Sequence, residues 1–156
     1  MKLGSEEKIV VQFYITEMGL VHAEIRLING GDIVRFEDKT IKEAQIRRVT
    51  ATMMVDSGAY MMCINETTQS QLGLKTKEKR IAQLADGSPI ELDIVGPIEV
   101  QFENRTATCN AMVLPGDTEM LLGAIPMEEM DVLIHPRESK LIVNPLHPNV
   151  AQLSLK

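Results

Sequence analysis

The feature that most constrains this chain is a repeated alternation of apolar and polar residues over short segments. Every second residue is apolar in 9–15, 21–27, 98–102 and 107–113. Successive side chains of a β-strand point to opposite faces, so a period of two predicts strands that each bury one face. Many short strands separated by turns favour a barrel or a sandwich over alternating strands and helices. The predicted fold class is all-β.

Shorter apolar runs predict further strands, and glycine, proline and asparagine mark the turns between them. Asp86-Gly87, within 85–89, is a strong hairpin signal between two of these runs. The predicted strands are 49–55, 60–64, 81–84, 90–94, 120–123, 132–134 and 141–143, and the predicted turns are Met18-Gly19, Gly30-Gly31-Asp32, Gly96-Pro97, Asn104-Arg105, Pro115-Gly116-Asp117 and His135-Pro136-Arg137.

One or two short helices accompany these strands. Asn65 is a suitable N-cap for a helix that ends at Leu72-Gly73, because its side chain can accept a bond from a free N–H of the first turn. Pro126 suits the first turn of a second short helix that runs to Met130. The charged stretch 29–48 is predicted to be a surface insertion or a short helix, and it suggests no chemistry.

The chain of 156 residues has room for one domain, with a core over about 20–146 and a tail over 147–156. Its net charge of −6 argues against nucleic acid as a partner, because phosphate binding needs a basic face. The basic residues Lys75, Lys77, Lys79 and Arg80 are expected to lie on a solvated loop or an edge strand.

No segment is apolar enough to cross a membrane, and the start of the chain, Met1 to Lys8, lacks the apolar core of a signal peptide. Cys63 and Cys109 are the two cysteines, and they fit either free buried thiols or one disulfide. We therefore expect a cytoplasmic protein. No cofactor or metal is predicted, because His22, His135 and His147 are scattered without metal-ligand spacing.

The segment with the clearest chemical potential is Asp56-Ser57-Gly58-Ala59. By itself the tetrapeptide is also a common turn sequence. Here, however, apolar runs flank it on both sides, Met53 to Val55 before and Tyr60 to Ile64 after. Burial makes a carboxylate costly to ionise unless it has a partner, and no cation lies nearby in the sequence. A second carboxylate would be a fitting partner.

These residues resemble the signature of retropepsin-like aspartic proteases, also called clan AA. Val55 to Ala59 is similar to the catalytic loop of that family, and Met120-Leu121-Leu122-Gly123-Ala124 is similar to its later apolar strand, which ends in glycine. The resemblance extends over about 21–145 and is strongest to bacterial single-domain members. It implies a closed β-barrel protomer, an acid-protease fold and an aspartic endopeptidase that acts on polypeptides.

The resemblance also implies a role for each site residue. Two copies of Asp56 would share a proton and activate one water, with Ser57 bracing the two loops and Gly58 and Ala59 supporting them. The predicted flap over the substrate is Ala85, Asp86, Gly87 and Ser88, and the structural glycine strand is Leu121, Leu122 and Gly123.

A single chain holds only half of such a site. Asp86, Asp117 and Asp131 lack both the following Ser/Thr-Gly and the flanking apolar strands, so Asp56 alone qualifies. A two-fold symmetric homodimer would supply the second copy. The chain departs from viral members of the family in its single-glycine flap, in Ala124 where they usually carry arginine, and in a longer segment before Asp56.

Two alternatives stay open at this stage. The chain could be a catalytically silent relative that binds peptides or assembles with other proteins. It could also be a structural β domain in which Asp56 only caps a turn. Serine and cysteine nucleophiles are not favoured, because Ser57 lacks the GxSxG elbow and Cys63 has no neighbouring base. The ten methionines fit core packing better than a binding surface.

Overall fold

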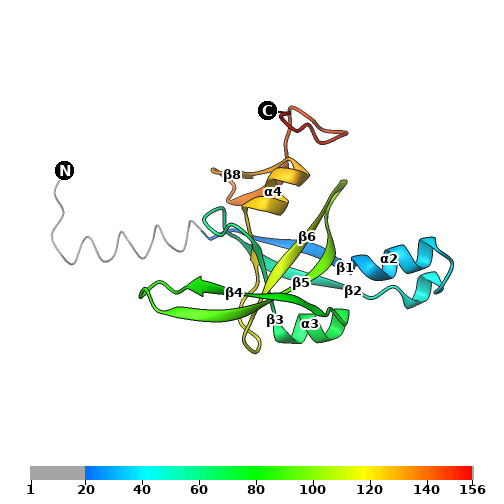
Figure 1. Cartoon of the computed structure of the whole chain (residues 1–156). Coiled ribbons are helices and arrows are strands. Elements are labelled where there is room, and N and C mark those ends of the chain that lie inside the picture. The colour runs from blue at the N-terminus through cyan, green and yellow to red at the C-terminus, as the bar shows by residue number, and fades with distance from the viewer. Residues whose placement is uncertain (1–19, 156) are drawn as a thin grey trace.

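The computed structural model describes residues 20–155 of the chain, and Figure 1 shows their arrangement. It is rich in strands, as the all-β prediction requires. The strands are β1 (His22–Asn29), β2 (Arg48–Val55), β3 (Met62–Asn65), β4 (Thr76–Gln83), β5 (Pro89–Phe102), β6 (Arg105–Leu114), β7 (Leu121–Leu122), β8 (Val132–His135) and β9 (Lys140–Val143).

Seven of these strands form one sheet in the order β1-β2-β7-β3-β6-β5-β4. Strand β1 also pairs with β5, where Arg26 lies opposite Gln101 and Asn29 lies opposite Ile98. Strand pairing therefore runs from β1 through β2, β7, β3, β6 and β5 and back to β1. Strand β4 pairs only with β5 and forms an edge of the sheet. Strands β8 and β9 form a separate antiparallel pair.

The core lies on the face of each strand that the alternation predicted. Along β1, the buried residues Ala23, Ile25 and Leu27 alternate with exposed ones. Met53, Met62 and Met130 are fully buried, which agrees with methionine as core filler. The largest fully buried side chains are Ile25, Leu27, Met53, Met62, Ile64, Leu72, Ile94, Ile98, Leu122 and Met130.

Three short α-helices, α2 (Gly30–Glu37), α3 (Glu66–Leu72) and α4 (Ala124–Met130), and a 3₁₀ turn, η1 (Glu43–Gln45), connect the strands. Residues 20–155 thus contain three α-helices rather than one or two, and α2 lies in the stretch 29–48, for which a short helix was one of the two predictions. Helix α3 has the predicted ends: the Asn65 side chain accepts from the Thr68 N–H at 2.9 Å, and Gly73 adopts a left-handed conformation. Figure 1 shows α2 at one end of the sheet and the β4–β5 hairpin reaching out at the opposite end.

Two of the predicted turns are not turns in the structure, and a third does not close the predicted hairpin. Gly96-Pro97 lies inside β5, at a register shift against β6, and its peptide bond is cis. Gly30-Gly31-Asp32 forms the first turn of α2. Pro115-Gly116-Asp117 does not close a hairpin, because the strand that follows, β7, pairs with β2 and β3. The predicted strand over 9–15 and the turn Met18-Gly19 lie outside the described residues.

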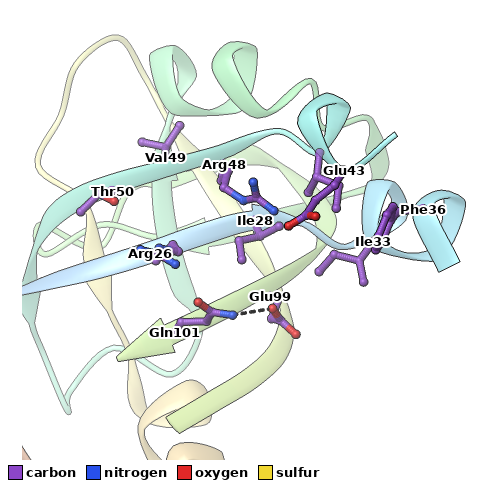
Figure 2. Close-up of a pocket in the computed structure, with 11 residues that line it drawn as sticks. Arg26, Ile28, Ile33, Phe36, Glu43, Arg48, Val49, Thr50, Glu99 and Gln101 are labelled. Carbon is purple, nitrogen blue, oxygen red and sulfur yellow. Dashed lines mark hydrogen bonds between the residues drawn. The ribbon is translucent and has the colours of Figure 1, made fainter. Parts of the chain in front are cut away.

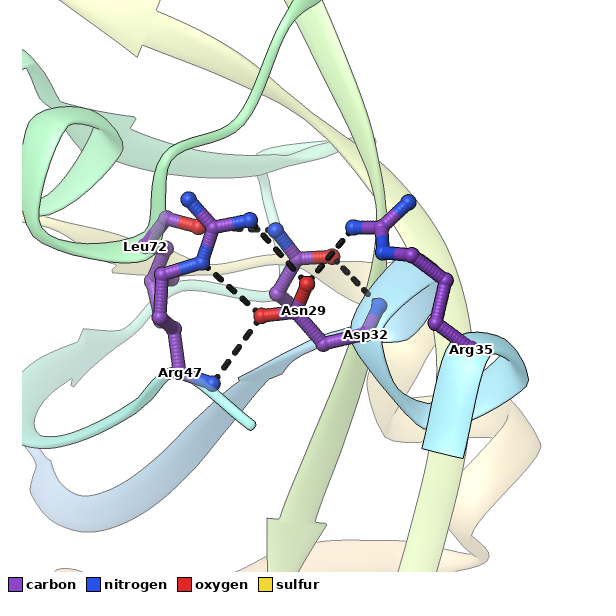
Figure 3. A network of polar contacts seen from close by, with 5 residues as sticks. All are labelled: Asn29, Asp32, Arg35, Arg47 and Leu72. Carbon is purple, nitrogen blue, oxygen red and sulfur yellow. Dashed lines mark hydrogen bonds and ion pairs between the residues drawn. The ribbon is translucent and has the colours of Figure 1, made fainter. Parts of the chain in front are cut away.

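The stretch 29–48 also contains a buried ion pair that the sequence did not reveal. Asp32 has 2% of its surface exposed, and guanidinium groups lie on both sides of its carboxylate (Figure 3). Arg47 donates to it from Nε at 2.8 Å, from Nη2 at 3.0 Å and from its backbone N–H at 3.0 Å. Arg35 donates from Nη2 at 2.6 Å. These bonds hold the pKa of Asp32 well below its ordinary value, chiefly through Arg47.

Asn29 connects this ion pair to the rest of the sheet. Its side-chain oxygen caps α2 by accepting from the Asp32 N–H at 3.0 Å, and its Nδ2 donates to the Leu72 carbonyl at 2.8 Å. The network therefore fastens α2 to β1, to the chain leading into β2 and to the end of α3.

The end of the described chain is attached through Asp131. Its carboxylate accepts from the Gln152 backbone N–H at 3.0 Å and from Asn144 Nδ2 at 3.0 Å, and His147 Nδ1 lies 2.6 Å away. The buried Arg105 side chain also donates to the His147 carbonyl. The bonds from Gln152, Asn144 and His147, in that order, lower the pKa of Asp131 to about 2.

We expect Asp131→Asn to release the segment 144–155. The folded pKa is lowered, so the attachment is fully present above the unfolded value of about 4 and is lost as the pH falls toward about 2. Limited proteolysis at neutral pH should cut this segment several-fold faster in the variant. Glu37→Gln, an exposed change on α2, is the control. Equal cleavage rates in the Asp131→Asn variant and wild type would show that other contacts hold the segment.

Candidate active site

Asp56 directly follows the last residue of β2. In the sheet, β7 lies between β2 and β3. Strand β7 pairs in parallel with β2, with Val55 opposite Leu122, and it pairs with β3 through Leu121 and Cys63. The Asp56 N–H donates to the Leu122 carbonyl at 3.0 Å. The two segments that carry the sequence signature lie far apart along the chain and are neighbours in the sheet.

The loop after β2 is a tight turn in which two backbone N–H groups donate hydrogen bonds to Asp56. The Gly58 N–H donates to Asp56 Oδ1 at 2.9 Å, and the Ala59 N–H donates to the Asp56 carbonyl at 3.1 Å. Ser57 and Gly58 are exposed, and Asp56 itself is half-buried. The Oδ1 atom of Asp56 is thus held by the Gly58 N–H of the same loop.

The next residues are attached to the start of α4. The Ala124 N–H donates to the Ala59 carbonyl at 2.7 Å, and the Ile125 N–H donates to the Tyr60 carbonyl at 3.1 Å. These bonds use helix-terminal N–H groups that have no partner within the helix itself. The loop of Asp56 and the glycine strand thus form one hydrogen-bonded unit.

Gly123 is required by the close approach of these two segments. A Cβ atom at this position would lie 2.5 Å from the Met61 carbonyl oxygen and 2.7 Å from that of Ala59. Both are backbone atoms, so the contact cannot be relieved by a side-chain rotation.

We expect Gly123→Ala to destabilise the fold by about 1–3 kcal/mol, the usual cost of an atom inserted into packed structure. Urea unfolding measures this change. Gly116→Ala is the comparison, since Gly116 has a positive φ but open space around its Cβ position. Only backbone strain, about 1 kcal/mol, applies there. A smaller loss at Gly123 than at Gly116 would contradict the close-packing argument.

The surroundings of Asp56 are less apolar than its flanking residues suggested. Val55 and Met62 are buried on either side of the loop, but Tyr60 is 74% exposed. Asp56 is therefore half-buried beside exposed residues rather than enclosed in the core.

Cys63 lies close enough to Asp56 for the two groups to interact. Burial raises the pKa of the Cys63 thiol, and the negative charge of Asp56 raises it further. Burial also raises the pKa of Cys109, to about 12. Both cysteines are free thiols, and their raised pKa values oppose a role as nucleophiles.

The predicted flap is the tip of the β4–β5 hairpin, which projects from the body of the molecule (Figure 1). Gly87 has a positive φ, which suits a glycine at a tight turn. Ser88 donates to Asp86 Oδ1 from its N–H at 2.9 Å and from its hydroxyl at 2.5 Å, and these bonds lower the pKa of Asp86. Ala85 and Leu84 are exposed beside it.

Midway along β4, the hairpin contacts the chain that follows the Asp56 loop. Arg80 Nη1 lies 3.8 Å from Met61 Sδ. The contact places Arg80 of β4 beside this segment. The basic residues of β4 are exposed on an edge strand, as predicted, and Lys79 pairs with Glu91 and Asp93.

The other aspartates considered have structural partners. Asp117 accepts from the Thr67 hydroxyl, and Asp131 holds the end of the described chain. Within residues 20–155, no group of three or more His, Cys, Asp or Glu side chains is placed to hold a metal ion. The helices in the same range are too short and too polar to span a membrane.

A cleft of about 640 Å³ lies elsewhere, between α2 and the outer face of the sheet (Figure 2). Arg26, Arg48 and Glu99 line it together with the apolar side chains of Ile33 and Phe36. Its wall includes the first residues of β2, whereas the Asp56 loop follows the other end of that strand. This cleft is therefore separate from the Asp56 site.

Comparison with family models adds the deciding observation. Residues 42–128, more than half of the chain, match the model of the gag-polyprotein putative aspartyl protease family. The matched range includes both Asp56-Ser57-Gly58-Ala59 and the glycine strand that binds it. The chain belongs to the retropepsin-like aspartyl proteases. A comparison with curated proteins found no match.

The motif Asp56-Ser57-Gly58-Ala59 stands out in the sequence, but the hydrogen-bonded unit that supports it does not. The bonds from Ala124 and Ile125 join backbone groups that are far apart along the chain. Gly123, at the end of an apolar run, was the available signal for a close backbone approach.

Proposed function

We propose that this protein is an aspartic endopeptidase whose active site contains the Asp56 carboxylates of two identical chains. The observation that carries the proposal is the position of Asp56: it is half-buried, next to the exposed Ser57 and Gly58, in a loop that is hydrogen-bonded to Leu122 and to the start of α4. A partly exposed carboxylate held by a rigid backbone is suited to meet its symmetry mate.

The chemistry follows from the repulsion between two close carboxylates. Two such groups cannot both ionise easily, so the pair holds one proton between them at intermediate pH. The ionised Asp56 takes a proton from a bound water, and the oxygen of that water attacks the carbonyl carbon of the peptide bond. The protonated Asp56 of the other chain donates a hydrogen bond to the carbonyl oxygen. An Asp56 carboxyl group then gives a proton to the peptide nitrogen, the carbon–nitrogen bond breaks, and the carboxylic acid and the amine leave, with no covalent intermediate on the protein.

The remaining residues support this pair. Gly58 fixes one oxygen of Asp56 through its N–H, and Ser57 is exposed beside it, where its hydroxyl can brace the loop of the second chain. The hairpin tip with Asp86, Gly87 and Ser88 would cover an extended peptide and bind its backbone. The proposal further includes a closed β-barrel protomer and a cytoplasmic location.

Hydrolysis of a mixed peptide library by the full chain from pH 3 to pH 8, about the span over which carboxylates and histidines titrate, tests the proposal. We expect cleavage with a bell-shaped pH dependence and a specific activity that falls on dilution. Binding of peptides without cleavage at any pH would instead support the catalytically silent alternative. Absence of both would favour a structural role for the Asp56 turn.

A further inference from the structure

A second cavity, of about 400 Å³, lies next to the Asp32 network. Three of its lining side chains are cations: Arg35 from α2, Arg47 from the chain before β2 and Lys75 from the chain before β4. Because these segments are far apart in the sequence, the fold alone brings the three charges together.

The cations of this cavity are only partly neutralised. Asp32, which is almost fully buried behind them, pairs with both arginines. Within residues 20–155, no other carboxylate forms an ion pair with Arg35, Arg47 or Lys75, whereas Lys79 on the adjoining strand is paired with two. The cavity thus holds three positive charges against one negative charge, in a protein whose net charge is −6.

Each arginine keeps unused hydrogen-bond donors. Arg35 binds Asp32 through Nη2, and Arg47 binds it through Nε and Nη2. A guanidinium group has five N–H donors, so the Nη1 group of each remains available. Figure 3 shows the two guanidinium groups flanking the Asp32 carboxylate, each with nitrogen atoms that point away from it.

Glycines leave room around these donors. Gly31 and Gly73 line the cavity, and a Cβ atom at Gly73 would collide with the Arg47 guanidinium. A Cβ atom at Gly31 would lie 3.4 Å from both terminal nitrogens of Arg35. Side chains at either position would therefore fill the space in front of the donors.

We propose that this cavity binds a phosphate group. Arginine is the residue best suited to phosphate, because its planar set of donors matches two phosphate oxygens, and a lysine adds a point charge. The cavity volume falls within the range of small-molecule sites, roughly 300–1,000 Å³, and leaves space for an organic group attached to the phosphate.

The cavity is at the root of the β4–β5 hairpin. Lys75 immediately precedes β4, and Gly96 and Pro97, which also line the cavity, lie where β5 leaves its pairing with β4. A phosphate held there would connect the root of the hairpin to α2. This site does not depend on the protease proposal, because binding can be measured without any substrate.

Thermal unfolding and calorimetric titration of the full chain with inorganic phosphate, at constant ionic strength set with sodium chloride, test the site. We expect a saturable rise in Tm and a binding constant that weakens on the order of tenfold in Lys75→Met. Lys77→Met is the matched control, since Lys77 is an exposed lysine nearby in the sequence that does not line the cavity, and it should bind as wild type does.

Glycerol phosphate as a second titrant distinguishes the source of the phosphate group. Tighter binding than inorganic phosphate indicates a phosphate ester as the ligand, and equal or weaker binding indicates free phosphate. A Tm that responds only to ionic strength, or an equal loss of binding in Lys75→Met and Lys77→Met, would overturn the proposal.

Discussion

Replacing Asp56 by asparagine should reduce peptide hydrolysis by a factor on the order of 10² to 10⁴, the contribution of a positioned general acid or base. Asparagine has nearly the same shape as aspartate, and its side-chain oxygen can keep the bond from the Gly58 N–H. It cannot take a proton from water. The loss should therefore appear in kcat rather than in the affinity for peptides.

Asp117→Asn is the matched control for this experiment. It removes one carboxylate from an exposed loop that bonds to Thr67, and it should leave kcat/KM close to the wild-type value. Urea unfolding of both variants would show that the fold is intact. Retention of wild-type activity by a folded Asp56→Asn protein would exclude Asp56 as the catalytic group.

The second large effect is expected for stability, at Asp32. Changing Asp32 to asparagine should lower the free energy of unfolding by about 2–4 kcal/mol, because two guanidinium groups lose the charge that they surround. This loss of unfolding free energy is smaller than the cost of breaking a fully buried ion pair, because the Arg35 and Arg47 side chains are about half exposed. Urea unfolding at pH 7 measures the change, and Asp38→Asn, an exposed aspartate at the end of α2, should change it little.

The contribution of Asp32 also depends on pH in a definite direction. Its pKa in the folded protein is lowered by Arg47 and Arg35, so the unfolded chain takes up the proton first. The stabilisation is fully present above the unfolded value, about 4, and is lost as the pH falls below it. Between pH 5 and pH 3, the stability of the wild type should therefore fall more steeply than that of Asp32→Asn. If the free energy of unfolding fell equally with pH in both proteins, Asp32 would not be ionised in the folded state.

The local features of the fold could be predicted because a few neighbouring residues determine them. The Asn65 cap, the Gly73 end of α3 and the Asp86-Gly87 hairpin each depend on bonds between near neighbours in the chain. Turn signals failed at Gly96-Pro97, where the residues on either side, Val95 and Ile98, both pair with neighbouring strands, so that the irregularity lies within one strand.

The supporting interactions of the site could not be predicted from local pattern. Strand β7 is very short, and its place between β2 and β3 depends on partners that are distant in the sequence. The partners of Asp32 likewise include Arg47, which lies beyond the end of α2, and a charged sequence gives no sign of which carboxylate is buried. The assignment of Asp56 came from a motif whose flanking apolar strands could be read directly.

If one active site uses Asp56 from two chains, mixing wild type with Asp56→Asn will inactivate wild-type subunits. With the wild-type concentration fixed, subunits that exchange freely form mixed dimers with one carboxylate. An equal amount of the variant should then lower activity to about one half, and a large excess should lower it toward zero. Activity that is unchanged by any amount of the variant, with exchange confirmed by tagged subunits, would show that each chain carries a complete site and would contradict the account.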